Sequence, residues 1–163
     1  LYTAQSGAQG PMAIRYPRGY SENPEWEQPF ERIPIGKARQ LKNGNRIAIL
    51  SFGTLGQHVA RAIPGTDTPE AFGHFDFRFA KPLDTDLLDE LCDSYEQLVT
   101  VEDGCLAGGF GSAVLEYLSS RKHSMPVTCL GIEDAFISHG TPEELYREQG
   151  LDTEGLLQTF NRL

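Results

Sequence analysis

The stretch RIAILSF, residues 46–52, decides the predicted fold of this chain. It is apolar on both faces and rich in β-formers, which is typical of a parallel strand buried between two helical layers. Gly53 and Thr54 end the run, and apolar residues then recur at helical spacing, namely Leu55, Val59 and Ile63. The segment therefore predicts a buried strand followed by an amphipathic helix.

The same alternation continues along the chain. We expect further strands at His74–Phe79, Gln97–Val101 and Pro126–Ile132, and Ile35–Leu41 could add an edge strand. Strands separated by helices at this spacing indicate βαβ units. The predicted fold class is α/β, a three-layer α/β/α sandwich with a mostly parallel central sheet.

Helix starts are marked by residues that accept hydrogen bonds from the first turn. Asp84 is a predicted N-cap, and one face of the helix after it carries Leu87, Leu88, Leu91 and Tyr95. Thr141 and Pro142 predict another start, with Thr at the N-cap and Pro at the first helical position. The glycine-rich Gly108–Ser112 opens a helix whose stripe is Val114, Tyr117 and Leu118, and a last helix is expected from about Asp152.

The residues before this series of strands and helices differ from it in polarity and in apolar pattern. Tyr20–Pro34 is polar and lacks an apolar period, so it is interpreted as a linker. Leu1–Gly19 ends in a short apolar run, Met12–Ile14, which predicts a strand. We therefore expect three parts: residues 1–19 from a preceding domain, a linker over 20–34, and an α/β domain over 35–163.

Composition excludes several classes of partner. The formal net charge is −9, with 14 basic residues against 23 acidic ones, and phosphate-backbone binders instead cluster their Lys and Arg. No apolar run approaches the length of a membrane span, and the first residues show no charged leader followed by an apolar stretch. We therefore expect neither a nucleic-acid nor a membrane partner.

The cysteines give no sign of a metal or disulfide framework. Cys92, Cys105 and Cys129 are dispersed, without a CxxC motif or a nearby pair of histidines. Such an odd set is typical of reduced thiols in a cytosolic protein.

Several polar residues are candidates for a site at the carboxyl edge of the sheet. Backbone N–H groups of Gly108–Ser112 could hold an anion, but close packing of helix on strand is the favoured interpretation, because the glycine spacing fits neither a Walker loop nor a dinucleotide fingerprint. Glu102 and Asp103 could touch a metal, although adjacent strand residues point to opposite faces, and polar residues starting a loop are favoured. His139 lies in a turn; a structural or exposed role is favoured over a functional one. His58, His74 and His123 have no partner visible in the sequence.

The segment Arg15-Tyr16-Pro17-Arg18-Gly19 is more specific. Its guanidinium groups follow the expected Met12–Ile14 strand, and a buried guanidinium is costly unless an anion pairs with it. The residues alone leave open whether that anion is an internal carboxylate or a bound phosphate.

A series of motifs resembles one enzyme family over nearly the whole chain. The series is GPMAIRYPRG, IPIGKAR, IAILSFGTL, FRFAKPLD, LVTVEDGCLAGGFGSAVLEYL and FISHGTPEEL, in that order from Gly10. It resembles the C-terminal third of the 1-deoxy-D-xylulose-5-phosphate synthase family. Transketolases and the beta subunits of pyruvate dehydrogenase share the fold of this domain but look less similar across these motifs.

The resemblance implies a function for the longer enzyme. Members condense pyruvate with D-glyceraldehyde 3-phosphate, releasing CO₂ and giving 1-deoxy-D-xylulose 5-phosphate for non-mevalonate isoprenoid, thiamine and pyridoxal synthesis. They are thiamine-diphosphate- and Mg²⁺-dependent transferases and homodimers, bacterial cytoplasmic or plastid-stromal. The phosphate-binding role of the second arginine of RYPRG maps onto Arg18 as a substrate-binding residue, and the resemblance gives Arg15, Gly108–Ser112 and His139 no role.

The resemblance also limits what this chain does by itself. The family holds its cofactor and metal in two other domains, and no catalytic, cofactor-binding or metal-binding residue is expected here. Residues 1–19 would then be the last helix and strand of the pyrimidine-binding domain, and the partners would be the remaining domains of the same enzyme. We expect an inactive C-terminal fragment without bound cofactor. The alternative is a C-terminal oligomerisation or binding module of another thiamine-diphosphate enzyme, transketolase or pyruvate dehydrogenase beta-like.

Overall fold

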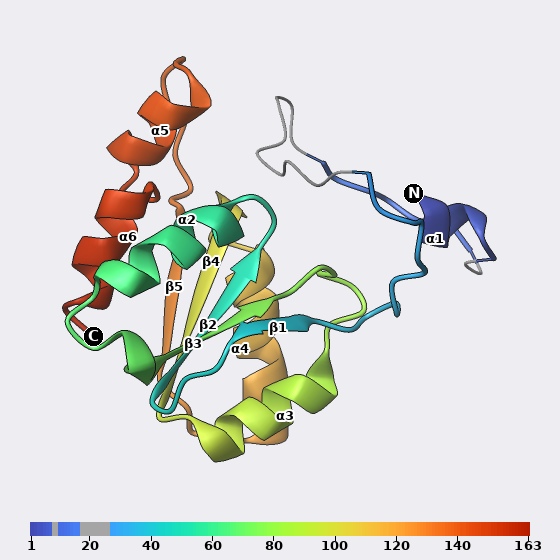
Figure 1. Cartoon of the computed structure of the whole chain (residues 1–163), viewed down its shortest axis with the longest axis horizontal. Helices are drawn as coiled ribbons and strands as arrows, with labels where there is room; N and C mark the ends of the chain where they lie inside the picture. The colour runs from blue at the N-terminus through green and yellow to red at the C-terminus, as the bar shows by residue number, and fades with distance from the viewer. Residues whose placement is uncertain (8–9, 17–26) are drawn as a thin grey trace. The chain divides into compact units, whose positions relative to one another are not determined.

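The computed structural model describes residues 1–7, 10–16 and 27–163 of the chain (Figure 1). The chain divides into two compact units, Leu1–Ile35 and Gly36–Leu163. The second unit carries the sheet and all but one of the described helices.

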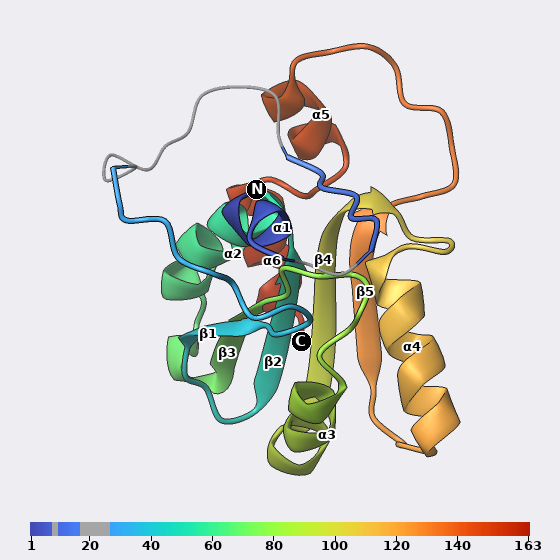
Figure 2. The same ribbon diagram turned by 90° about the vertical axis from the view of Figure 1, so that its right-hand side faces the viewer.

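A five-stranded sheet forms the centre of the second unit. Its strands are β1 (Arg39–Lys42), β2 (Ile47–Phe52), β3 (Phe72–Asp76), β4 (Gln97–Cys105) and β5 (Val127–Ile132). Their order is β1-β3-β2-β4-β5, as Figure 2 shows from the side. The pairs β2–β3, β2–β4 and β4–β5 are parallel, and β1 is antiparallel to β3. The predicted mostly parallel sheet is confirmed.

Helices cover both faces of the sheet and complete the predicted three layers. The α-helices of this unit are α2 (Leu55–Ala62), α3 (Thr85–Ser94), α4 (Phe110–Arg121), α5 (Pro142–Glu148) and α6 (Thr153–Phe160), and two short 3-10 helices, η1 (Ile63–Gly65) and η2 (Pro69–Ala71), lie between α2 and β3. Helices α2 and α6 pack on one face, and α3 and α4 pack on the other. The sheet is therefore covered on both sides along β2 and β4.

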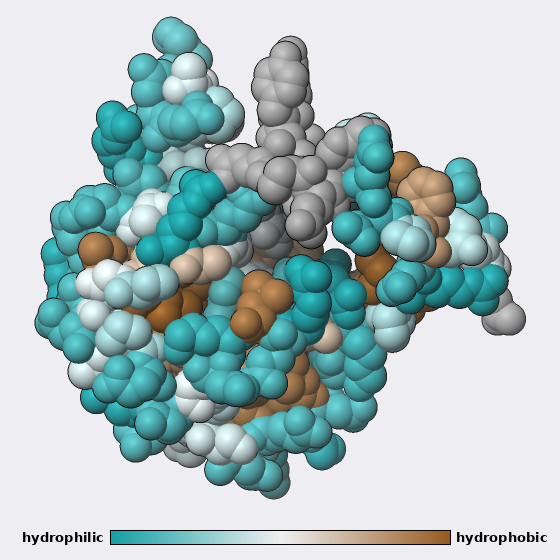
Figure 3. Space-filling view, in the orientation of Figure 1, coloured by the Kyte–Doolittle hydropathy of each residue, from teal (hydrophilic) through white to brown (hydrophobic). Residues whose placement is uncertain are grey.

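Alternation along β2 divides the core into two clusters. Ile47 and Ile49 pack toward α2 and α6, whereas Ala48 and Leu50 pack toward α3 and α4. All four are at most 1% exposed, so burying apolar surface on both faces stabilises the central strand. The outer surface shown in Figure 3 is largely hydrophilic, interrupted by separate apolar patches.

The predicted strands differ from the observed ones mainly at their ends. Strand β4 continues four residues beyond Val101 to Cys105, and β3 covers Phe72–Asp76 instead of His74–Phe79. Strand β3 begins earlier because Phe72 and Gly73 pair with Ile47 and Ala48 of β2. The possible edge strand is present as β1, although it begins at Arg39.

The two predicted N-caps, Asp84 and Thr141, are present, and Asp152 caps the last helix, which was expected from about that residue. Asp84 accepts a hydrogen bond from the N–H of Leu87, and Asp152 accepts one from the N–H of Gly155. Thr141 and Glu144 form a reciprocal capping box at the start of α5. Each of these caps lies within four residues of sequence, which is why the pattern alone located Asp84 and Thr141.

The described part of the first unit contains one short helix, α1 (Tyr2–Gln5). Residues 30–33 pair with it: the rings of Tyr2 and Phe30 stack with centroids 5.7 Å apart, and the Ile33 N–H donates to Thr3 Oγ1 at 2.8 Å. Arg32 also donates to the carbonyl of Ser6. The end of the predicted linker thus folds back on α1.

The strand predicted at Met12–Ile14 is wrong. Residues 11–16 have neither helical nor strand structure, and Met12 and Ile14 are 38% and 41% exposed. Three apolar residues form a stable strand only beside a partner strand, and the described part of the first unit contains none.

Candidate functional site at the carboxyl edge of the sheet

The strand order defines the position at the edge of the sheet where this type of fold binds ligands. The connection from β2 leads to β3 on one side, whereas β4 pairs with the other side of β2. Helices α2 and α4, which follow β2 and β4, pack on opposite faces. Ligands of open α/β sheets lie beyond the carboxyl ends of the strands at such a point. Here this position lies beyond Phe52, the last residue of β2, and beside Glu102 of β4, which pairs with Phe52.

The Glu102 carboxylate occupies the start of α4. Its Oε2 accepts a hydrogen bond from the N–H of Phe110 at 2.7 Å, and its Oε1 accepts one from the N–H of Gly111 at 2.8 Å. Glu102 is 3% exposed. A buried carboxylate at the positive end of a helix dipole, with two charge-assisted hydrogen bonds, is favourably placed. The interpretation of Glu102 as a polar residue starting a loop is therefore wrong.

The glycines of Gly108–Ser112 allow this close approach. A Cβ on Gly109 would lie 2.2 Å from the Cys105 carbonyl oxygen and 2.4 Å from Glu102 Oε2. A Cβ on Gly111 would lie 2.7 Å from Thr100 Oγ1 and 2.9 Å from Cys129 Sγ. Close packing of helix on strand, the interpretation favoured from the sequence, is confirmed.

The hydrogen bonds to Glu102 also argue against an anion site in the loop Gly108–Ser112. The N–H groups of Phe110 and Gly111, which would face a bound phosphate, already donate to Glu102. An incoming anion would also meet the charge of that carboxylate. The Glu102 carboxylate is therefore an internal anion that connects the start of α4 to β4.

A chain of polar contacts crosses the other side of the same edge. The Tyr146 hydroxyl of α5 donates to Asp103 Oδ2 at 3.0 Å, and the Tyr146 ring meets the His58 ring edge-on with centroids 5.6 Å apart. His58 Nδ1 lies 3.1 Å from Thr153 Oγ1 at the start of α6. Asp103 and Glu102 thus point to opposite sides of β4, as adjacent strand residues do. These contacts connect β4, α2, α5 and α6.

Two of the remaining histidines also have partners in the fold. His74 is 1% exposed, its Nε2 lies 2.8 Å from Ser51 Oγ, and burial, followed by the charge of Arg39, lowers the pKa of its imidazole to about 4. His123 Nε2 lies 3.0 Å from Asp89 Oδ1, and Tyr117 donates to the same carboxylate. His139 is exposed in the connection between β5 and α5. The sequence missed the partners of His58, His74 and His123, because each partner lies on a different element.

The described residues contain no metal centre. No three His, Cys, Asp or Glu side chains gather there in a way that could hold a metal ion. Cys92, Cys105 and Cys129 are free thiols. The residues in the described ranges therefore offer no cluster of this kind for a metal ion. None of the described helices is long and apolar enough to cross a membrane.

Arg18, the predicted substrate-binding residue, lies outside the described residues. Arg15 is described and exposed. Because the predicted strand before it is absent, the argument from a buried guanidinium does not hold for Arg15. The role of Arg18 therefore depends on the resemblance of the RYPRG segment.

Comparison with known proteins identifies the class. Residues 36–156 match the family model described as transketolase, C-terminal domain. The chain belongs to this family.

Comparison with individual curated proteins gives a more specific match than the family model. The chain is 42% identical over 164 residues to the 1-deoxy-D-xylulose-5-phosphate synthase of Bacteroides fragilis, covering 99% of this chain and 25% of the relative. It is 44% identical over 157 residues to the synthase of the same name from Pseudoalteromonas translucida, covering 96% of this chain and 24% of the relative. The chain thus spans about a quarter of the length of the curated relatives that it matches.

Solved structures support the same fold. A split-gene transketolase, described as an inactive beta4 tetramer, aligns with a TM-score of 0.73 at 28% identity, covering 90% of this chain and 46% of that chain. The transketolase of Campylobacter jejuni aligns with a TM-score of 0.57 at 13% identity over 78% of this chain and 19% of that one, which shows the fold alone.

Proposed function

We propose that this chain supplies the C-terminal domain of a 1-deoxy-D-xylulose-5-phosphate synthase. The observation that carries the proposal is the 42% identity to the Bacteroides fragilis synthase across 99% of the chain. The enzyme would be a thiamine-diphosphate-dependent transferase joining pyruvate to D-glyceraldehyde 3-phosphate with loss of CO₂. It would act as a Mg²⁺-dependent homodimer in the bacterial cytoplasm or the plastid stroma.

In this proposal the cofactor and the metal are held by the other three quarters of the enzyme. Residues 1–19 would belong to the preceding pyrimidine-binding domain, 20–34 would connect, and 35–163 would form the C-terminal domain. The described residues support this division of labour, since their one helix start beyond a glycine-rich loop is filled by Glu102. The 163-residue chain alone is expected to have no activity, and the related split-gene structure is likewise described as inactive.

A domain exchange tests the proposal. The C-terminal quarter of the Bacteroides fragilis synthase would be replaced by this chain, and 1-deoxy-D-xylulose 5-phosphate formation would be measured. We expect the chimera to retain activity within about tenfold of the parent, a loss of about 1.4 kcal/mol of transition-state stabilisation. A matched chimera with the C-terminal domain of the Campylobacter jejuni transketolase serves as control.

The control separates the two candidate functions. If the transketolase domain supports the reaction as well as this chain does, the chain is a general assembly module. If the chimera with this chain folds and dimerises but makes no product, the synthase assignment is wrong.

Within the active chimera, we propose that Arg18 binds the phosphate of glyceraldehyde 3-phosphate. A guanidinium can meet two phosphate oxygens at once, and a hydrogen bond to a charged group contributes about 1.5–3 kcal/mol. Arg18→Ala should therefore lower kcat/KM for the triose phosphate by roughly 10- to 150-fold, while the KM for pyruvate changes little. With glyceraldehyde, which lacks the phosphate, variant and parent should be almost equally poor. An equal loss with both aldehydes would instead give Arg18 a structural role.

A further inference from the structure

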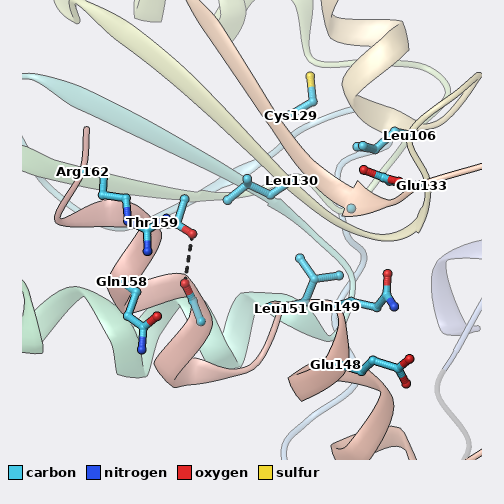
Figure 4. A pocket seen from close by; sticks show the side chains of 13 residues that line it. Leu106, Cys129, Leu130, Glu133, Glu148, Gln149, Leu151, Gln158, Thr159 and Arg162 are labelled. Carbon is cyan, nitrogen blue, oxygen red and sulfur yellow. Dashed lines mark hydrogen bonds between the residues drawn. The ribbon is translucent and has the colours of Figure 1, made fainter.

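A pocket of about 540 Å³ lies between the edge strand β5 and the helices α5 and α6. Its volume falls within the range of about 300–1,000 Å³ that is usual for small-molecule sites. Figure 4 shows Arg162 at one end and Glu133 and Glu148 at the other, with Leu130 between them. The pocket thus has a basic end and an acidic end.

The three charges around the pocket are not used by the fold. Within the described ranges, the side chains of Arg162, Glu133 and Glu148 form no hydrogen bond and no ion pair. At the other edge of the sheet, by contrast, Arg39 pairs with Asp76 at 3.0 Å. Two carboxylates at one end of a pocket repel each other unless a cation lies between them. The three charged groups are therefore available to a ligand.

The part of the pocket between the charged ends is apolar, with one hydroxyl group. Leu130 of β5 and Leu151, which precedes α6, line this part (Figure 4). The Thr159 hydroxyl donates to the Gly155 carbonyl at 3.0 Å, so its oxygen can still accept a hydrogen bond. Apolar walls with a few polar groups suit a ligand that has methylene groups in its middle.

The length of α6 sets the separation of the two ends. Glu148 lies five residues before the first residue of α6, and Arg162 lies two residues after its last. Eight helical residues span about 12 Å, so the charged ends are separated by a distance of this order. Arg and Glu side chains can cover part of it, and a linear ligand of roughly 7 Å, the length of a chain of six single bonds, bridges the rest.

The balance of charge selects the class of ligand. Arg162 contributes +1, and Glu133 and Glu148 contribute −1 each, which gives −1 for the pocket. The complementary ligand therefore carries one anionic group, two cationic groups and an apolar chain. A chain of net charge −9 also attracts a cationic ligand over a longer range.

We propose that this pocket binds a basic amino acid of the lysine and arginine class. The α-carboxylate of the ligand meets the Arg162 guanidinium, which can donate to both of its oxygens. The side-chain cation lies between Glu133 and Glu148, and the methylene groups lie against Leu130. The α-ammonium group donates to the Thr159 hydroxyl, which is close to Arg162 because the Thr159 carbonyl accepts from the Arg162 N–H at 3.1 Å. This binding is a property of the chain itself and does not depend on the synthase reaction.

Calorimetric titration of the 163-residue chain with matched ligands tests the site. L-Lysine and L-arginine should each bind with a Kd below about 1 mM. L-Norleucine lacks the side-chain ammonium of lysine, and cadaverine lacks its carboxylate. Each should bind at least about tenfold more weakly, the effect of losing one hydrogen bond to a charged group. L-Glutamate, whose side-chain charge is reversed, should not bind at about 10 mM.

Variants assign the two ends of the ligand. Arg162→Gln should raise the Kd of lysine at least about tenfold without weakening the binding of cadaverine, which has no carboxylate. Glu133→Gln combined with Glu148→Gln should weaken lysine in the same way without weakening norleucine, which has no side-chain cation. Arg46→Gln and Glu116→Gln, at exposed positions outside the pocket, are the matched controls and should leave the Kd within about twofold.

Amide chemical shifts locate the ligand. The amides of Leu130, Gly131 and Leu151 should shift when lysine is added, whereas those of Arg39–Lys42 should not. A chain that binds neither lysine nor arginine at about 10 mM overturns the inference. So does equal binding of lysine, norleucine and cadaverine, or an equal weakening by Arg162→Gln and Arg46→Gln. The ligand series needs no substitution, so it tests the site even where a variant fails to fold.

Discussion

Helices α4 and α5 follow neighbouring parallel strands, yet their N-termini are held in different ways. Helix α4 has a glycine at its N-cap, Gly109, and no capping side chain of its own, and its first N–H groups are bound by Glu102, eight residues earlier on β4. Helix α5 is capped within four residues by Thr141 and Glu144. It contains no buried residue, whereas α4 buries Phe110, Gly111, Val114 and Leu118.

The start of α4 is thus held by a contact between two elements, whereas the start of α5 is held by contacts within its own first turn. The start of α4 exists only when β4 has formed and the helix has packed on it, so its stability is part of the global unfolding free energy. The capping box of α5 forms within one turn and contributes to the local free energy of that helix. Substitutions in the two places should therefore differ in size and in the measurement that detects them.

The largest effect is expected for Glu102→Ala. It leaves two N–H groups of α4 without a protein partner, and two hydrogen bonds to a charged group together contribute about 3–5 kcal/mol. Urea unfolding of the 163-residue chain should show this loss. Glu116→Ala, an exposed position on the same helix, should change the free energy by less than about 0.5 kcal/mol. A loss below about 1 kcal/mol for Glu102→Ala would mean that water replaces the carboxylate and that the joint is weak.

A somewhat smaller loss is expected for Gly111→Ala. Its Cβ would lie 2.7 Å from Thr100 Oγ1 and 2.9 Å from Cys129 Sγ, so the helix must move off the sheet. We expect a net loss of about 2 kcal/mol, since overpacking costs about 1–3 kcal/mol and Ala regains part of this through its helix propensity. The control is Gly140→Ala, just before α5, where the new Cβ meets only the side-chain ends of Leu145 and Glu144. Equal effects at the two glycines would contradict the contrast between the helices.

Thr100→Val should act in the opposite direction. Thr100 Oγ1 is buried beneath α4 and is the one buried side-chain polar atom in the described ranges with no hydrogen-bond partner. Replacing an unsatisfied hydroxyl by a methyl group of similar shape should stabilise the chain by about 1 kcal/mol. Thermal unfolding measures this, with Ser51→Ala as the contrasting variant, because Ser51 Oγ is paired with His74 and its loss should destabilise. If Thr100→Val destabilises, the hydroxyl has a partner such as an internal water.

The smallest effect concerns acid pH and α5. Hydrogen bonds from the backbone and then the hydroxyl of Thr141 lower the pKa of Glu144 below its usual value. A lowered folded pKa means that the carboxylate stabilises the helix fully above about pH 4.3, the ordinary value, and that this contribution disappears as the pH falls through the folded pKa. Hydrogen exchange of the α5 amides should therefore quicken in that range, relative to α4. Glu144→Gln, which can still accept a hydrogen bond, should remove the pH dependence of this difference.

The sequence predicted most of the fold because most of its elements, like the capping box of α5, depend on residues that are close together in the chain. The buried strand predicted at 46–52, observed at Ile47–Phe52, and the caps Asp84 and Thr141 depend on residues close in sequence, and each is present. The Glu102 cap was missed because it joins a strand to a helix eight residues later. A signal did exist: the predicted helix after Gly108 had glycine where a capping side chain should stand, so another residue had to supply the acceptor. The Met12–Ile14 strand was wrong because strand pairing depends on a partner that a single segment does not show.

The Glu102 joint also determines where the chain tolerates changes of length. Its two oxygens contact residues eight and nine positions later, so inserting one residue anywhere between Glu102 and Phe110 would displace both N–H groups from the carboxylate. The connection between Ile132 and Thr141 carries no such contact to the helix that follows it, because α5 brings its own cap. Natural or engineered insertions, including an affinity tag or a reporter loop, should therefore be accepted between β5 and α5 and rejected between β4 and α4.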